Sequence, residues 1–345
     1  ERPGDLATLA DAARVSVVAH GSRLSLYDAL PPPGMGIGNP NFATLSAPPS
    51  ALVGGQLEVL AAHGSTVSFL PIRGGTTPAE RSFDAPVVAL CISPGGGEIL
   101  VATRDGRLHC HDGARMLRGY VETGLDSPRL LCAAERLAAI AGAQELVLVD
   151  LEARGVLERL DLRGLGSEIA GLALSRDGAS LALGTSDGQG LLFSIPSATS
   201  APGAALRPRA AWGDPAGRHA GALRLIAVRA GRLLSGDAEG ALHVWDPASG
   251  AALRSIRIGS RRAPPAYTLN HAGDRVWIRE AYRLREFDVA TGHELRRLPR
   301  PKSHSIHAAL REDDLELAVL GFAGDVEVWD LERGQRRFSQ PVKRR

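Results

Sequence analysis

A short pattern recurs along the chain and constrains its fold more than any other feature. An alternating apolar strand is followed by a tight turn, and a second alternating strand then ends in an aromatic residue and Asp. The pattern is plainest at residues 233–246 (LLSGDAEGALHVWD) and 317–330 (LAVLGFAGDVEVWD). Aligning the rest of the chain on these segments gives eight copies. Their aromatic positions are Tyr27, Phe69, His111, Val149, Phe193, Trp245, Phe287 and Trp329.

The spacing of the copies predicts the architecture. Successive aromatic positions lie 42, 42, 38, 44, 52, 42 and 42 residues apart. A period of about 42 residues with a strand–turn–strand core is typical of a four-stranded propeller blade. An almost entirely apolar strand, such as 169–175, precedes the core, and a strand that alternates apolar and charged residues, such as 252–258, follows it. We therefore predict an all-β chain that forms a closed β-propeller of four-stranded antiparallel blades, as a single domain over residues 1–345.

The two ends of the chain decide the predicted number of blades. The first copy, residues 6–28, aligns with residues 129–150 and lacks nothing at its start. Too few residues precede it to donate an outer strand to the last blade, so we expect residues 336–342 to provide that strand. This predicts eight complete blades. Seven blades with an additional N-terminal hairpin is the alternative.

The repeat resembles the WD40 family over essentially the whole chain. Six of the eight copies keep the Asp after the aromatic position, although only two keep the Trp. WD40 blades tend to carry a hydrogen-bonded tetrad of His, Ser or Thr, Asp and Trp. The alignment indicates partial versions at Thr103 with Asp105 and at Thr185 with Asp187, has His219 as a candidate in the sixth repeat, and finds no complete set. Links such as DVATGH (288–293) are also similar to those of quinoprotein-type propellers, which are often eight-bladed.

The two resemblances imply different functions. WD40-like propellers in bacteria are often the C-terminal sensing or scaffolding part of a longer signalling chain, and the absence of an initial Met fits such a part or a processed fragment. Quinoprotein dehydrogenases bind calcium and a quinone on the axis. Inner-strand segments such as 87–93 and 222–228 offer almost no polar groups for such a site. We expect a non-catalytic scaffold or regulatory module without a cofactor, and keep a propeller enzyme or cofactor-binding protein as the alternative.

Metal and thiol chemistry have little support in the sequence. In a strand, His109 and His111 point to one face and Cys110 to the other, whereas tetrahedral zinc needs about four converging ligands. Cys91, Cys110 and Cys132 fit no metal or disulfide spacing. We expect no metal and three buried free thiols, which are typical of the reducing cytoplasm. No apolar run reaches the roughly 20 residues of a membrane span.

Charge suggests the chemistry of a partner. The formal net charge of +2 gives no general attraction to nucleic acid or membranes. Arginines nevertheless form a band on the outer strands and links of the last three repeats, without interleaved aromatic residues that would stack on bases. The band has two interpretations: protection of exposed sheet edges, or a site for an acidic partner. Its candidate partner-binding residues are Arg261, Arg262, Arg296, Arg297 and Arg300.

The longest interval between copies contains the other candidate contact. Residues 195–219 form a predicted loop that carries Arg207, Arg209 and Trp212. Trp and Arg are the residues most enriched at binding hot spots, so we expect a protein partner to bind here. In the alternative interpretation, Trp212 folds back and covers its own blade. We expect the propeller to be monomeric within a hetero-complex or a longer chain.

Overall fold

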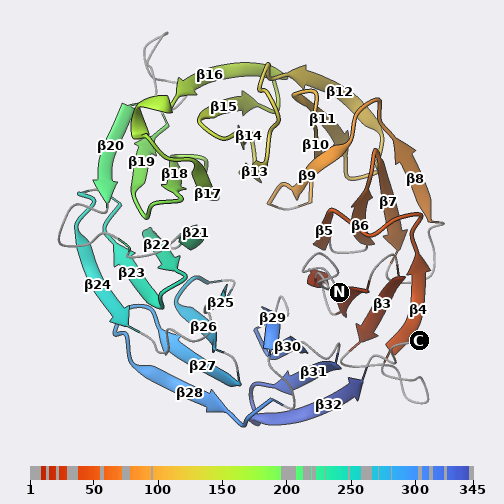
Figure 1. Ribbon diagram of the computed structural model, residues 1–345, viewed down its shortest axis with the longest axis vertical. Coiled ribbons are helices and arrows are strands. Elements are labelled where there is room, and N and C mark those ends of the chain that lie inside the picture. The colour runs from red at the N-terminus through yellow and green to blue at the C-terminus, as the bar shows by residue number, and fades with distance from the viewer. Residues whose placement is uncertain are drawn as a thin grey trace. The chain divides into compact units, whose positions relative to one another are not determined.

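The strands of the computed structural model pair in groups of four, in the order of the chain (Figure 1). Packing divides the chain into two units. Unit 1 comprises Glu1–Leu90 with Ala266–Arg345, and unit 2 comprises Cys91–Pro265. The structure describes residues 9–12, 15–20, 23–28, 38–54, 58–71, 78–94, 96–195, 207–212, 219, 223–229, 231–247, 249–257, 266–270, 272–280, 282–301, 305–310, 314–321 and 325–341.

The described strands of unit 2 form antiparallel sheets of four consecutive strands each. They are β9 (Val87–Ile92, which starts just before the boundary), β10 (Glu98–Thr103), β11 (Arg107–Asp112) and β12 (Leu117–Glu122); β13 (Leu130–Ala133), β14 (Leu137–Ala141), β15 (Glu145–Asp150) and β16 (Gly155–Asp161); β17 (Ile169–Leu174), β18 (Ser180–Thr185), β19 (Gly190–Ser194) and β20 (Arg207–Trp212); β21 (Leu223–Arg229), β22 (Arg232–Asp237), β23 (Ala241–Trp245) and β24 (Ala252–Arg257). A 3-10 helix, η1 (Arg163–Leu165), follows β16. Neighbouring sheets meet at their first strands, since β13 contacts β17 and β17 contacts β21. Figure 1 shows two of these sheets, β13–β16 and β17–β20, beside each other.

The described strands of unit 1 follow the same plan. They are β1 (Leu9–Ala12), β2 (Val15–His20), β3 (Arg23–Asp28) and β4 (Gly38–Thr44); β5 (Ala51–Gly54), β6 (Glu58–His63), β7 (Thr66–Pro71) and β8 (Ala79–Ser82); β25 (Ala266–Leu269), β26 (Arg275–Glu280), β27 (Arg283–Asp288) and β28 (Glu294–Leu298); β29 (Ser305–Leu310), β30 (Glu316–Gly321), β31 (Asp325–Asp330) and β32 (Gln335–Pro341). β25 contacts β29, β29 contacts β1, and β1 contacts β5. The sheets at the two ends of the chain are therefore neighbours.

Both terminal sheets are complete. The last sheet takes its outer strand, β32, from its own segment, which confirms the strand expected at residues 336–342. The first sheet also contains four strands of its own, β1–β4. Each of the two sheets thus satisfies its internal ladder without borrowing a strand from the other.

The predicted aromatic positions occupy one place in the third strand of each sheet, and those from Phe69 to Trp329 are buried. Trp245 packs with Ala182 and Leu192 of the preceding sheet. Trp329 packs with Trp277 and Leu298 of the preceding sheet in unit 1. The prediction that these two tryptophans pack between sheets is confirmed. Because large apolar surfaces are removed from water here, the aromatic positions contribute strongly to sheet–sheet packing.

A β-bulge recurs between the third and fourth strands, immediately before the aromatic position. The register shifts lie at Cys110/His111, Leu148/Val149, Leu192/Phe193, Val244/Trp245, Glu286/Phe287 and Val328/Trp329. A bulge adds one residue to the outer strand and reverses which side chains face the sheet. The additional residues are Arg118, Leu157, Arg209, Leu253, Leu295 and Arg337. The outer strands therefore do not keep the simple alternation that their sequences suggest, and apolar side chains reach the surface.

One predicted loop is partly wrong. Within residues 195–219, the segment Arg207–Trp212 is strand β20, the fourth strand of its sheet, paired with β19. The segment RPRAAW lacks an alternating pattern and contains Pro208, which suggested a loop. Pro208 lies opposite Phe193 at the bulge of an edge strand, where a proline is tolerated. The parts of the segment at 196–206 and 213–218 lie outside the described residues.

Candidate functional site

A buried hydrogen-bond network links β22 and β23 to His219. The His219 ring lies 3.0 Å from Asp237 Oδ2 through Nδ1 and 2.7 Å from Ser235 Oγ through Nε2. Trp245 Nε1 donates to the same Ser235 Oγ at 2.7 Å. These four side chains form a complete His–Ser–Asp–Trp tetrad. The prediction that no repeat has the full set was wrong, because the alignment placed Asp237 in the Ser position and overlooked Ser235.

The tetrad is a structural network whose polar atoms bind one another. Burial by itself would raise the pKa of Asp237, but the hydrogen bond from His219 and the backbone N–H groups of Ala241 and Glu239 lower it overall. Those two N–H groups donate to Asp237 Oδ1 at 2.8 and 2.9 Å, so this carboxylate also holds the turn between β22 and β23. The two nitrogens of the His219 ring both have partners within the network. The tetrad therefore stabilises its sheet and presents no group to a ligand.

His243 extends this network. Its ring lies edge-on to His219 with centroids 4.6 Å apart, and its Nδ1 is 2.6 Å from Ser255 Oγ. Burial, together with the charges of His219 and Arg257 and against the opposing effect of Asp237, lowers the pKa of His243 to about 4. His243 is thus neutral in the folded protein at neutral pH.

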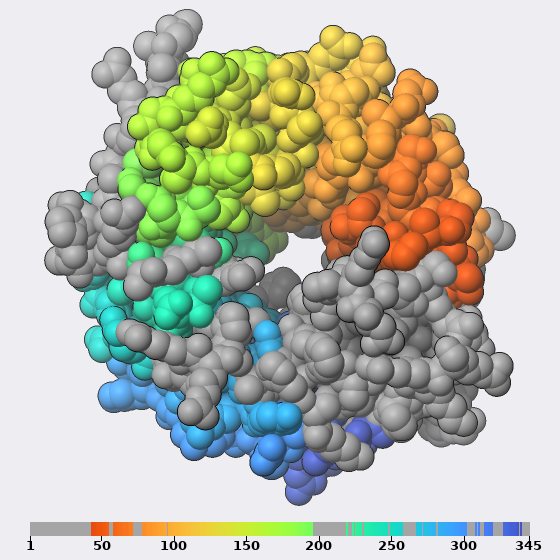
Figure 2. Space-filling view, in the orientation of Figure 1, coloured from red at the N-terminus to blue at the C-terminus, as the bar shows by residue number. Residues whose placement is uncertain are grey.

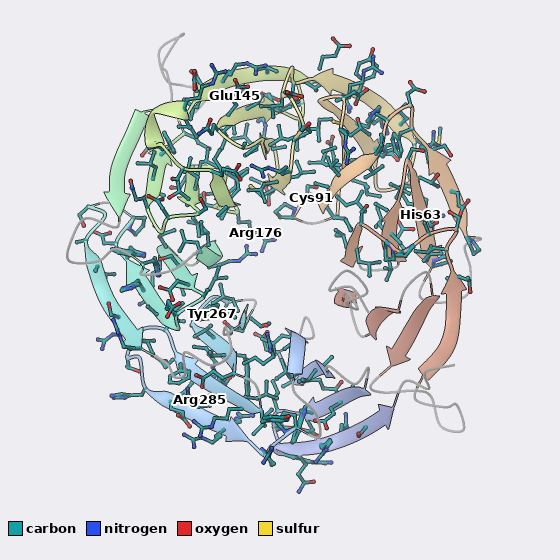
Figure 3. All side chains as sticks on the ribbon, in the orientation of Figure 1. His63, Cys91, Glu145, Arg176, Tyr267 and Arg285 are labelled. Atoms are coloured by element: carbon teal, nitrogen blue, oxygen red, sulfur yellow. The ribbon has the colours of Figure 1, made fainter. Side chains whose placement is uncertain are left out.

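Related side-chain hydrogen bonds recur in other sheets. Thr103 Oγ1 donates to Asp105 at 2.6 Å and Thr185 Oγ1 donates to Asp187 at 2.5 Å, as the partial tetrads predicted. His63, labelled in Figure 3, lies 2.8 Å from Ser68 Oγ through its Nε2 atom. These polar side chains hold turns and adjacent strands together.

The surroundings of His111 and of the three cysteines also fit a structural role. His111 is fully buried at the aromatic position of its repeat. Burial raises the pKa of Cys91 and of Cys110 to about 11 and also raises the pKa of Cys132, and all three thiols are free. A protonated thiol is a poor nucleophile and a poor metal ligand. Among the described residues, no group of three or more His, Cys, Asp or Glu side chains is placed to hold a metal ion. In the same part of the chain, no helix is long and apolar enough to cross a membrane.

Several arginines of the basic band neutralise buried carboxylates. Arg296 on β28 places its Nε atom 3.4 Å from Oε2 of Glu286, which is 5% exposed. Two arginines of β32 act in the same way: Arg336 lies 2.8 Å from Glu327, and Arg337 contacts Glu316. A buried carboxylate without a cation would be strongly destabilising. These arginines therefore have a structural role, in addition to covering a sheet edge.

Other arginines of unit 1 point to the surface beside a tyrosine. The pairing of Leu284 with Leu298 brings the turn before β27 next to the end of β28. There the Arg300 guanidinium stacks 4.4 Å from the ring centroid of Tyr282, which is 40% exposed. Arg283, the first residue of β27, is exposed next to Tyr282 in sequence. Neither Arg283 nor Arg300 forms an ion pair with another residue that the structure describes.

Arg297 completes this group. Its side chain is 60% exposed and holds Glu294 through two hydrogen bonds of 2.9 and 3.1 Å. Arg285, labelled in Figure 3, lies 3.5 Å from the same carboxylate and also contacts Glu280. We refer to Tyr282, Arg283, Arg297 and Arg300 as the arginine–tyrosine surface. Tyr282 was absent from the sequence-based candidates, because its position in a turn of the repeat carried no signal.

The remaining predicted contact residues are only partly covered by the structure. Strand β20 contains Arg207, Arg209 and Trp212, and the structure describes only the backbone of these residues. Arg261 and Arg262 lie outside the described residues altogether. The structure therefore places Arg297 on β28 and Arg300 just after it, adds Tyr282 and Arg283, and assigns Arg296 to an ion pair with a buried carboxylate.

A second surface lies on the outer strands of two neighbouring sheets in unit 2. Its exposed apolar side chains are Met116, Leu117 and Tyr120 in and before β12, and Val156 and Leu157 on β16. The two strands are in contact. Figures 1 and 2 show the corresponding segments next to each other, in orange-yellow and yellow-green. We call this surface the apolar edge. The sequence analysis missed it because the bulge before Val149 makes residues of β16 face outward that alternation alone would bury.

Comparisons with known proteins support the same architecture. A family model described as "Outer membrane protein assembly factor BamB" matches residues 197–345. A solved structure described as "Crystal structure of the computationally designed Ika8 protein: crystal packing No.1 in P63" has a TM-score of 0.69 at 18% identity, over 85% of this chain and 86% of that chain. Another, described as "Crystal Structure of Mitotic Checkpoint Complex", has a TM-score of 0.62 at 15% identity, over 95% of this chain and 89% of that chain. The curated protein sequences contain no significant match.

At these identities the solved structures indicate the fold alone. The family match covers the C-terminal part of the chain, and it favours the quinoprotein-like branch of propellers over the WD40 branch. Four-stranded antiparallel sheets in chain order, with sheet–sheet packing at the first strands, agree with both comparisons. Together these findings support a β-propeller architecture for this chain.

Proposed function

We propose that this chain is a non-catalytic propeller that binds a protein and acts as a scaffold or assembly module. The observation that carries the proposal is the match of residues 197–345 to a family described as an assembly factor, which is a description of a binding protein and not of an enzyme. The side-chain chemistry supports it. The buried His, Asp and Thr groups are occupied in structural hydrogen bonds, whereas aromatic and arginine side chains lie at the surface.

The proposal includes a closed ring of eight blades in one domain, formed by a monomer in a bacterial regulatory or assembly complex. The contact of β1 with β29 supports closure, because it joins the first sheet to the last. The three free thiols support a cytoplasmic location. Fractionation of native cells with an antibody to the chain tests the location, and recovery outside the cytoplasm would contradict it.

The arginine–tyrosine surface is the proposed contact for an acidic segment of the partner. Arg283 and Arg300 offer guanidinium groups for charge-assisted hydrogen bonds to carboxylates. The Tyr282 ring holds Arg300 in place by a cation–π contact and itself offers a large, rigid contact area. A pre-positioned side chain loses less entropy on binding, which favours affinity.

The test begins with a photo-cross-linking residue in place of Tyr282 in the native host, followed by identification of the cross-linked protein. The purified partner is then titrated against the double variant Arg283→Ala/Arg300→Ala. Loss of a hot spot predicts binding that is weaker by about tenfold or more, with an unchanged melting temperature. The matched control is Arg254→Ala/Arg257→Ala on β24, which removes two arginines that are equally exposed. An equal loss in the control would show general electrostatic attraction and no defined site.

A further inference from the structure

We propose that the apolar edge is a second docking surface, on which an extended, uncharged segment of a partner protein adds to strand β16. This surface lies in unit 2 and goes beyond the acidic contact proposed for unit 1. Three observations carry the inference: the concentration of exposed apolar side chains, the contrast with equivalent strands, and the chemistry of the strand edge.

The exposed apolar side chains are concentrated on one surface. Nine large apolar residues are exposed in the part of the chain that the structure describes, and five of them belong to the apolar edge. Their exposed fractions are 62% for Met116, 45% for Leu117, 50% for Tyr120, 43% for Val156 and 50% for Leu157. Single exposed apolar residues are common, but a contiguous group marks a surface that is used for binding.

The equivalent position is charged on two other outer strands, β28 and β32. Leu117 lies opposite His111 and Val156 lies opposite Val149, at the aromatic position of each repeat. The corresponding residues of β28 and β32 are charged, Glu294 opposite Phe287 and Arg336 opposite Trp329, whereas those of β8, β20 and β24 are Ala79, Pro208 and Ala252. Charged residues on outer strands prevent sheets from pairing edge to edge. β12 and β16 lack this protection at the same place in the repeat.

Two arginines beside the apolar edge form ion pairs. Arg118 lies 2.7 Å from Asp112, and Arg154 lies 3.7 Å from Glu98. These two cations are already compensated and the five side chains of the apolar edge are apolar, so the complementary occupant is apolar. The Tyr120 ring lies under the Arg107 guanidinium at 5.1 Å, which leaves its remaining surface for apolar contact.

The unpaired edge of β16 favours a partner segment with an extended backbone. Arg159 extends from β16 and donates to the backbone oxygen of Thr123, so it covers the end of β12. Among the described strands, β16 pairs only with β15, and its other edge presents N–H and C=O groups. An added strand satisfies those groups and places alternate side chains against Val156 and Leu157, whereas a helix satisfies its backbone internally.

The test uses a library of random 12-residue peptides displayed on phage, selected on the whole chain. Leu157→Arg introduces the charged residue found at the equivalent Arg337 of β32. Leu253→Arg on β24 is the matched control, since Leu253 is also the additional residue of a bulge and is 57% exposed. We expect selected peptides with apolar residues at alternate positions. Their affinity should fall by about tenfold or more in Leu157→Arg and by less than about twofold in Leu253→Arg.

Amide hydrogen exchange provides the second measurement, and binding of a selected peptide should slow exchange in β16. Peptides with apolar residues at helical spacing, acidic peptides, equal losses in the two variants, or no enrichment would each overturn the inference. So would a dimer in light scattering that Leu157→Arg converts to monomer, because the occupant would then be a second copy. The same peptides should bind Arg283→Ala/Arg300→Ala unchanged, which separates this inference from the proposed acidic contact.

Discussion

Trp245→Ala is expected to lower the free energy of unfolding by about 3–5 kcal/mol, the range for truncating a buried aromatic residue to Ala. Trp245 is 2% exposed and packs against the preceding sheet, and its Nε1 atom donates to Ser235 in the tetrad. The substitution therefore removes apolar contacts and a buried hydrogen bond together. Chemical denaturation followed by circular dichroism measures the effect. A loss below about 1 kcal/mol would mean that this position is not part of the packing between sheets.

A comparison with Trp329 separates the hydrogen bond from the packing. Trp329 occupies the equivalent position and is fully buried, but its Nε1 has no hydrogen-bond partner in the described structure. The residue equivalent to Ser235 in this sheet is Val319, which has no hydroxyl group to accept the hydrogen bond. Trp245→Phe should therefore cost about 1 kcal/mol more than Trp329→Phe, since only the first removes a buried hydrogen bond. Equal losses would contradict the tetrad geometry.

Acidification is expected to destabilise the fold through His243. Its pKa falls from 6.5 to about 4 on folding, so the unfolded chain binds a proton more readily between these values. The free energy of unfolding should therefore decrease as the pH falls from about 6.5 to about 4. The total loss from this group is about 3.5 kcal/mol at most, at about 1.4 kcal/mol for each unit of pKa difference. Above about pH 6.5 this group should no longer make the free energy of unfolding depend on pH.

His243→Asn tests this assignment through the slope of stability against pH, whatever its effect on stability at neutral pH. The slope between pH 6.5 and 4 should become smaller in this variant and remain unchanged in His293→Asn, which alters an exposed histidine. The Asp237 carboxylate affects stability in a separate pH range. Its pKa is lowered in the fold, so its contribution is complete above about pH 4 and is lost only below that value. A slope that persists in His243→Asn would assign the pH dependence to other groups.

The sequence predicted the fold where one period repeats with little variation. The third strand of each repeat was located through its aromatic position, because the spacing near 42 residues and the alternation agree there. β20 was missed because Pro208 and two adjacent alanines give no alternation, and only pairing with β19 makes the segment a strand. Local pattern therefore identified strands with a strong period, whereas tertiary pairing determined the others.

The surfaces were harder to predict than the core. Arg296 and Arg297 are adjacent in sequence, yet one reaches a buried glutamate and the other an exposed one. That difference depends on which carboxylate lies across the sheet, and composition does not contain this information. The apolar edge depends on a bulge that reverses the alternation at Leu157, and a bulge leaves no clear mark in a single sequence. The tetrad was missed by a misalignment of two residues at Ser235.

The two terminal sheets also bear on how the gene could be rearranged. β1 and β29 come from opposite ends of the chain and are in contact, while each of their sheets owns its four strands. This junction needs no covalent continuity, because β1 and β29 are in contact without a peptide link between them. A circular permutant that links the present ends and opens the chain in the exposed turn at Glu152 and Ala153 would retain every strand pairing described for the sheets. The order in which ribosomes make the sheets is thus separable from the order in which the sheets pack.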